Sequence, residues 1–149
     1  MRREMERLYQ SPLFQRAASY IEQDAAHTVE QQVELTQIPA FSNQERQKAL
    51  RFRELMEAEG YSAEMDEVCN VFTRIPGTGE GPTLYVTAHL DTVFPMDTDL
   101  QVRREGSKIF CPGIADDTRG CAEILALLRA LRESGIRPVG DLLIGANVG

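Results

Sequence analysis

His89 and Asp91 stand two residues apart directly after a short apolar run, a spacing that could serve metal chemistry. Side chains at positions i and i+2 of an extended chain point to the same side, so the imidazole and the carboxylate can meet while Leu90 turns into the core. A metal-bound imidazole commonly donates its second ring N–H to a carboxylate, which fixes the tautomer and the orientation of the ring. On its own, this three-residue pattern favours a hydrogen-bonded histidine near the surface. The surrounding sequence decides between this interpretation and a metal ligand.

Two adjacent acids, Asp116 and Asp117, lie between Gly113 and Gly120, where a helix is predicted to begin. The positive end of a helix dipole and its free N–H groups favour carboxylates at this place. Because a carboxylate has two oxygens, one aspartate can bridge two divalent cations, and a pair of ions ~3.5–4 Å apart clamps a hydrolytic water and a substrate carbonyl. The simpler alternative is that these acids only cap the helix, and for Asp117 or Thr118 both interpretations stay open.

Three predicted elements position the two motifs. Residues 83–88 form a nearly continuous apolar run between breakers, which predicts a strand buried on both faces. Residues 118–134 carry apolar side chains at helical spacing and end at Gly135, which predicts a helix with Arg129 outside its apolar face. Residues 141–146 predict another strand. A strand, a helix and a strand in this order indicate a βαβ unit within an α/β fold with a largely parallel sheet.

The first half of the chain is predicted to be mainly helical. Residues 13–37 favour one helix or two, ended by Pro39. Residues 42–45 have the S-x-x-E form of a capping box, which predicts the start of a further helix that ends at Gly60. Short strands are expected at 61–65 and 70–75, followed by a turn-rich loop at 76–82.

Composition excludes several classes of protein. Sixteen Lys and Arg against 23 Asp and Glu give a formal net charge of −7, which argues against a nucleic-acid partner. No apolar run approaches the ~18 residues of a membrane span. The charged N-terminus lacks the apolar stretch of a signal peptide, so we expect a cytoplasmic protein. The three cysteines are an odd number and include no C-x-x-C pair, so we expect Cys69, Cys111 and Cys121 to be free thiols.

The two motifs together resemble a known family. Residues 83–93 (TLYVTAHLDTV) and 111–120 (CPGIADDTRG), followed by an alanine- and leucine-rich helix, are similar to the co-catalytic zinc enzymes that include peptidase T, glutamate carboxypeptidase, acetylornithine deacetylase and aminoacylase. The resemblance covers most of residues 30–149. It implies a three-layer α/β catalytic domain of the zinc-exopeptidase type with a largely parallel central sheet, incomplete at its C-terminal end.

The resemblance also implies roles for individual residues. His89 would ligate one metal, Asp116 would bridge two divalent ions, most simply zinc with cobalt or manganese as alternatives, and Asp91 would be the catalytic-site residue that orients His89. The peptide bond between Asp116 and Asp117 is expected to be cis. One position departs from the family, because relatives often carry lysine where this chain has Thr118.

The resemblance further implies that residues 1–149 are the N-terminal part of a single metallopeptidase catalytic domain. The C-terminal half, the general base, later ligands and a lid domain that often dimerises would be absent, so we expect little hydrolysis and weak metal binding. His27, the other histidine, is expected to be a solvated surface residue. The intact protein would hydrolyse amide bonds of short peptides, like a tripeptide aminopeptidase or a carboxypeptidase. The alternatives are an N-acyl amino acid deacylase and a non-catalytic α/β binding module.

Overall fold

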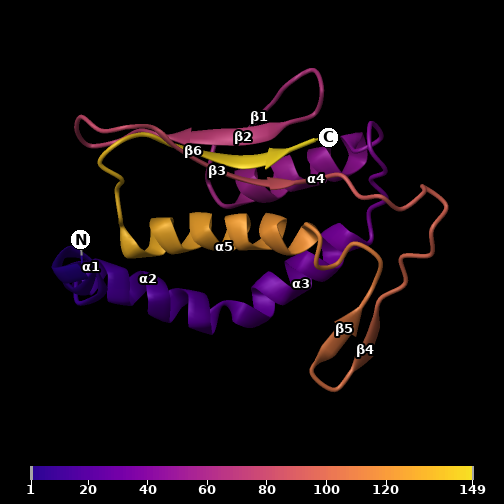
Figure 1. Cartoon of the computed structure of the whole chain (residues 1–149), viewed down its shortest axis with the longest axis horizontal. Helices are drawn as coiled ribbons and strands as arrows, with labels where there is room; N and C mark the ends of the chain where they lie inside the picture. The colour runs from indigo at the N-terminus through magenta and orange to yellow at the C-terminus, as the bar shows by residue number, and fades with distance from the viewer. Residues whose placement is uncertain (1, 149) are drawn as a thin grey trace.

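The computed structural model describes residues 2–148 and has the α/β fold predicted from the sequence (Figure 1). The helices are α1 (Arg2–Tyr9), α2 (Pro12–Gln23), α3 (Ala25–Thr36), α4 (Arg46–Ala58) and α5 (Thr118–Ser134). The strands are β1 (Glu64–Met65), β2 (Val71–Ile75), β3 (Leu84–His89), β4 (Arg103–Glu105), β5 (Lys108–Phe110) and β6 (Leu142–Asn147). The predicted helix over 13–37 is thus two helices, α2 and α3, that meet at Asp24.

Four strands form one mixed sheet in the order β1-β2-β6-β3. β3 and β6 run parallel with His89 opposite Asn147, so the predicted βαβ unit is present as β3–α5–β6. β2 runs antiparallel to β6, and β1 runs antiparallel to β2. The sheet is therefore less parallel than the sequence predicts, because β1 and β2 are joined by a short connection rather than by a helical crossover.

The helices are stacked in two layers beneath this sheet. α5 packs against β3 and β6, and α4 packs against β1 and β2. α2 and α3 pack against α5, which therefore lies between the N-terminal helices and the sheet (Figure 1). The apolar core fills the space between α4, α5 and the sheet, and its fully buried large side chains include Leu35, Phe52, Met56, Val71, Leu90, Leu125, Leu128 and Ile144.

The burial of β3 differs from the prediction. Leu84 and Tyr85 are 61% and 53% exposed, and within the strand only Ala88 is buried. The expectation of a strand buried on both faces is wrong for the described residues. β3 is an edge strand with β6 as its single neighbour in the sheet, and α5 is the one described helix that packs against it.

α4 begins at Arg46, and the predicted capping box at 42–45 is wrong. The Ser42 hydroxyl donates to a carboxylate oxygen of Asp91 at 3.3 Å instead of accepting a helical N–H. The Glu45 carboxylate accepts from the backbone N–H of Asn43 at 2.7 Å. Both side chains therefore stabilise a turn in front of the helix, and this turn carries Ser42 toward the end of β3.

The second face of α5 is also buried, which the apolar pattern does not predict. Arg129 is only 2% exposed. Its guanidinium donates to Asp24 at 2.6 and 2.8 Å, to Gln31 at 2.6 Å and to Glu59 at 3.3 Å. A buried cation is destabilising unless charges and hydrogen bonds compensate it, and Asp24 and Glu59 supply this compensation. The sequence prediction failed because α2 and α3 cover this side of α5.

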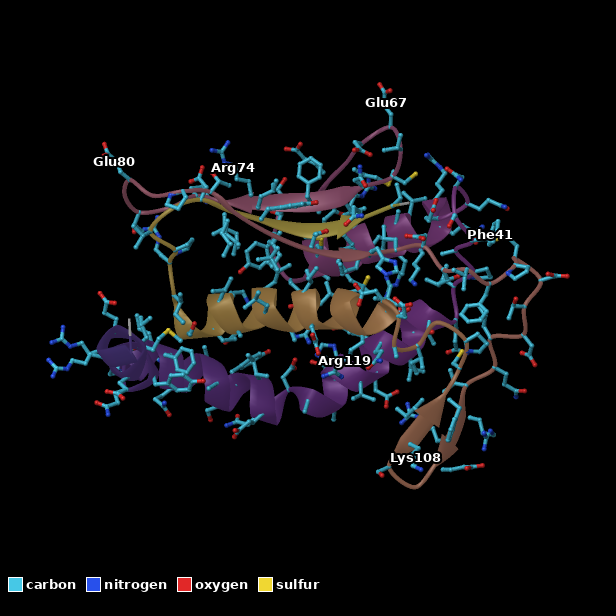
Figure 2. The ribbon with its side chains drawn as sticks, in the orientation of Figure 1. Phe41, Glu67, Arg74, Glu80, Lys108 and Arg119 are labelled. Atoms are coloured by element: carbon cyan, nitrogen blue, oxygen red, sulfur yellow. The ribbon has the colours of Figure 1, made fainter. Side chains whose placement is uncertain are left out.

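The predicted helix ends and the predicted free thiols agree with the structure. Gly60 and Gly135 follow α4 and α5 with φ values of +86° and +71°, as the predicted helix ends require. Cys69, Cys111 and Cys121 are free thiols. Over residues 2–148, none of the helices has both the length and the apolar character needed to cross a membrane. β4 and β5 form a hairpin that projects from the body, with Lys108 near its turn (Figure 2).

Candidate metal centre

The imidazole of His89 faces oxygen atoms on both sides. Its Nδ1 lies 3.1 Å from the backbone carbonyl oxygen of Asp91 and 3.2 Å from a carboxylate oxygen of the same residue. Its Nε2 lies 3.0 Å from Oδ1 of Asp116. The predicted meeting of His89 with Asp91 is confirmed, and the structure also brings His89 to Asp116 at this rim of the sheet.

Asp116 and Asp117 have different surroundings, although they are adjacent. The peptide bond between them is cis, as expected, and the Asp116 side chain is 91% exposed. The Asp117 carboxylate accepts the backbone N–H of Gly120 at 3.0 Å and that of His89 at 3.2 Å. Asp117 is therefore the N-cap of α5, and it links the start of this helix to the end of β3. Arg119, labelled in Figure 2, lies in the same helical turn.

Asp91 is held beneath the imidazole. Its side chain is 16% exposed, and one carboxylate oxygen accepts the Ser42 hydroxyl. The other oxygen, Oδ1, is buried and accepts no hydrogen bond from the described residues, although it lies 3.2 Å from Nδ1 of His89. The Ser42 contact thus fixes Asp91 by one oxygen and leaves the other directed at the ring.

This geometry creates a demand for positive charge at His89. A neutral imidazole carries one N–H, yet both ring nitrogens face only acceptor oxygens. Burial acts to lower the pKa of His89, but the hydrogen bond with Asp116 and the charges of Asp91 and Asp117 outweigh it, so this pKa is raised. When Nδ1–H is donated to the backbone carbonyl of Asp91, Nε2 and the Asp116 carboxylate present lone pairs to each other. They then need a cation between them, which is either a proton or a metal ion.

The donor types suit a metal ion, but the set is partial. Zinc takes imidazole nitrogen and carboxylate oxygen as ligands, which His89 and Asp116 provide. Among residues 2–148, no group of three or more His, Cys, Asp or Glu side chains is arranged to hold a metal ion. The second histidine, His27, has a 52% exposed side chain and contacts Asp24 at 3.2 Å, in agreement with the expected surface position.

Lys48 and Ser42 were not identified from the sequence as parts of this region. Lys48 is 1% exposed, and its ammonium donates to the hydroxyl of Thr118, the first residue of α5, at 3.0 Å. A signal was present, because Lys48 precedes Phe52 and Met56 by one and two helical turns and so falls on the buried face of α4. Ser42 carried no such signal, since its contact depends on the turn before α4.

Comparison with known proteins identifies the family. The family model described as Peptidase family M28 matches residues 70–149, which is more than half of the chain. The chain belongs to peptidase family M28. The match includes β3, α5 and β6 and therefore all three residues His89, Asp91 and Asp116.

Individual relatives are also peptidases. Carboxypeptidase G2 from Pseudomonas sp. (strain RS-16) is 39% identical over 77 residues, which make up 50% of this chain and 18% of that protein. Two solved structures have the fold of this chain: a tripeptidase from Staphylococcus aureus (27% identity, TM-score 0.66) and aminopeptidase PepT from Bacillus cereus (25% identity, TM-score 0.68). Each of these two comparisons covers 82% of this chain and 36% of the solved one.

The resemblance predicted from the motifs at 83–93 and 111–120 is confirmed by these relatives, which include PepT and a carboxypeptidase. The chain spans far less than two thirds of the length of each relative.

Proposed function

We propose that this chain supplies part of the metal centre of an exopeptidase that hydrolyses amide bonds of short peptides. The observation that carries the proposal is the 3.0 Å approach of His89 Nε2 to Asp116 Oδ1, because with Nδ1–H donated to the backbone carbonyl of Asp91 both are acceptor atoms that need a cation between them. Family membership and the peptidase relatives support the same reaction class.

In this proposal, His89 and Asp116 would hold the divalent ions, His89 as a ligand of one and Asp116 as a ligand shared by two, with zinc as the favoured ion and cobalt or manganese as alternatives. Bound ions would polarise the substrate carbonyl and lower the pKa of the attacking water. Asp91 accepts the N–H at Nδ1 and so keeps the lone pair of Nε2 directed at Asp116. Asp117 fixes the backbone at both His89 and α5, which sets the distance between the two ligand-bearing segments.

Short peptides are the favoured substrates because the named relatives include a tripeptidase, an aminopeptidase and a carboxypeptidase. An N-acyl amino acid has the same amide bond beside a free carboxylate and is the competing substrate. Since the chain spans 18% to 36% of these relatives, the remaining ligands and the general base are proposed to come from further polypeptide of the intact protein.

The test compares the intact protein with the variants His89→Gln and His27→Gln. Hydrolysis of di- and tripeptides and of N-acetyl amino acids is measured with added zinc, cobalt or manganese. We expect turnover of peptides by the wild type, a loss of at least about 10²-fold in His89→Gln, and no change in His27→Gln, whose imidazole is exposed.

Three results would contradict the proposal or narrow it. Equal activity of His89→Gln and the wild type would exclude a ligand role for His89. Absence of hydrolysis with all three metals would favour the non-catalytic alternative. Cleavage of N-acetyl amino acids alone would replace the peptidase assignment with the deacylase.

A further inference from the structure

A buried lysine lies behind the candidate metal centre and takes no direct part in it. Lys48 belongs to α4, is 1% exposed, and reaches the Thr118 hydroxyl with its ammonium at 3.0 Å. Thr118 is itself fully buried. A hydroxyl group stabilises an ammonium only in part, and burial of a charge without a compensating charge is strongly destabilising. The position therefore requires negative charge nearby.

The charges that compensate Lys48 come from the metal centre. Burial lowers the pKa of Lys48, while the charges of Asp117 and Asp91 act in the opposite direction. Cys121 is also adjacent, but burial raises the pKa of its thiol to about 12, so it is neutral at pH 7 and cannot offset the ammonium. The pKa of Lys48 stays below its ordinary value because burial outweighs these charges, so Asp117 and Asp91 are the nearby anions that offset its burial in part.

The same two carboxylates control the geometry of His89. The Oδ1 atom of Asp91 lies 3.2 Å from Nδ1, which is hydrogen-bonded to the backbone carbonyl of the same residue, and the Asp117 carboxylate accepts the backbone N–H groups of His89 and Gly120. Asp116 and Asp91 contact the imidazole itself, and Asp117 contacts the backbone of the same residue. Lys48 contributes a buried cation to this cluster. Arg119, the second residue of α5, is instead paired with Glu123 at the surface.

We propose that Lys48 is a positioning residue of the candidate metal centre, whose buried ammonium balances Asp91 and Asp117 and, through Thr118, fixes the start of α5 against His89. This inference rests on the proposed metal site for its function but not for its geometry. Loss of the charge leaves the partly buried carboxylates of Asp91 and Asp117 without the neighbouring cation, and they relax toward solvent. The imidazole then loses the support that orients it toward Asp116.

The test uses Lys48→Met, which keeps the length and removes the charge, and Thr118→Val, which keeps the charge and removes the hydroxyl. Hydrogen exchange of the His89 and Gly120 amides reports the position of Asp117 in the 149-residue chain without metal. We expect Lys48→Met to accelerate both exchanges at least about tenfold and to weaken cobalt binding by roughly 10–100-fold, the range typical of residues that orient ligands. Thr118→Val should show smaller changes of the same sign.

A matched control separates positioning from general stability. Leu55 lies on the same helix and is 7% exposed, so Leu55→Ala should lower the free energy of unfolding without a specific effect on the two amides or on cobalt affinity. The double variant Lys48→Thr/Thr118→Lys places an ammonium in the same space from α5. It should recover part of the cobalt affinity that Lys48→Met loses.

The outcomes distinguish this inference from the proposed function. Tighter cobalt binding in Lys48→Met would show that the lysine merely repels the ion, and would overturn the inference. Unchanged exchange at His89 and Gly120 in Lys48→Met would overturn it as well. Absence of cobalt binding by the wild-type chain and by the intact protein would contradict the proposed function. The amide exchange measurement would still decide whether Lys48 positions Asp117 and the start of α5.

Discussion

His89 and Asp116 are 27 residues apart in the chain, yet Nε2 of one lies 3.0 Å from Oδ1 of the other. The parallel β3–α5–β6 unit produces this contact, because β3 ends at the same rim of the sheet at which α5 begins. Asp117 then ties the two segments together by accepting the backbone N–H of His89. The pair is thus a consequence of the fold rather than of local sequence.

Asp116→Asn should lower the pKa of His89 in the metal-free chain. Burial works against the protonated imidazole, and the hydrogen bond with Asp116 is the leading contribution that raises its pKa above the ordinary 6.5. The chain has only two histidines, so a proton NMR titration can follow each imidazole separately. His27 serves as the internal control. An unchanged His89 titration in Asp116→Asn would mean that the two side chains do not interact in solution.

The raised pKa of His89 also fixes the sign of a pH effect in that experiment. A group whose pKa is higher in the folded state adds stability below its unfolded pKa, and this contribution disappears as the pH rises through the folded value. The stability difference between the wild type and Asp116→Asn should therefore shrink between about pH 6 and pH 8. Urea unfolding at a series of pH values provides the measurement.

Arg129→Met should be strongly destabilising. The substitution leaves the carboxylates of Asp24 and Glu59, with side chains 10% and 11% exposed, without their buried partner. Breaking a buried pair in this way typically costs about 3–5 kcal/mol of unfolding free energy, which urea unfolding measures directly. Arg132→Met is the matched control. Its side chain is 43% exposed, so a loss of about 1 kcal/mol or less is expected, and equal losses in both variants would refute the argument.

Asp24 should make the fold sensitive to acid. Burial acts to raise its pKa, but the hydrogen bond with Arg129 and the charge of that residue outweigh it, so the pKa lies below the ordinary 3.8. A carboxyl group with a lowered pKa adds stability above its unfolded pKa and loses that contribution as the pH falls through the folded value. The advantage of the wild type over Asp24→Asn should therefore decline below about pH 5. A constant difference down to pH 2 would contradict the buried ion pair.

The sequence predicted the βαβ unit because it follows from strong local signals. Apolar periodicity over 118–134 and the run over 83–88 determine the elements, and element order then places His89 and Asp116 at one rim. Neither the exposure of β3 nor the antiparallel position of β2 could be deduced in this way. Both depend on which strand lies beside which, and that information is not local.

Charged residues on buried faces escaped prediction for a related reason. A prediction that places every charged side chain in solvent misses Lys48 and Arg129. Their partners, Thr118 and Asp24, lie 70 and 105 residues away in the chain. The capping-box prediction failed similarly. Ser42 has the residue type of an N-cap, but its tertiary contact with Asp91 replaces the local hydrogen bond.

Gly145→Ala should disrupt the centre of the sheet. A Cβ at this position of β6 would lie 2.6 Å from Cα of Phe72 and still closer to the carbonyl oxygen of Val71, both on the neighbouring strand β2. Backbone atoms cannot move aside as a side chain can, so β2 and β6 must separate. Overpacking of this kind costs about 1–3 kcal/mol or more, measured as a lower urea midpoint.

Gly79→Ala is the control for this substitution. The nearest atom to its added Cβ would be a side-chain carbon of Val139 at 3.8 Å, which is an ordinary contact, so little change in stability is expected. Because β6 joins the paired strand β3 to β2, Gly145→Ala should also displace β3 and weaken the coupling between His89 and Asp116. A variant that keeps both the wild-type midpoint and the wild-type His89 titration would show that the two strands do not approach as closely as this glycine requires.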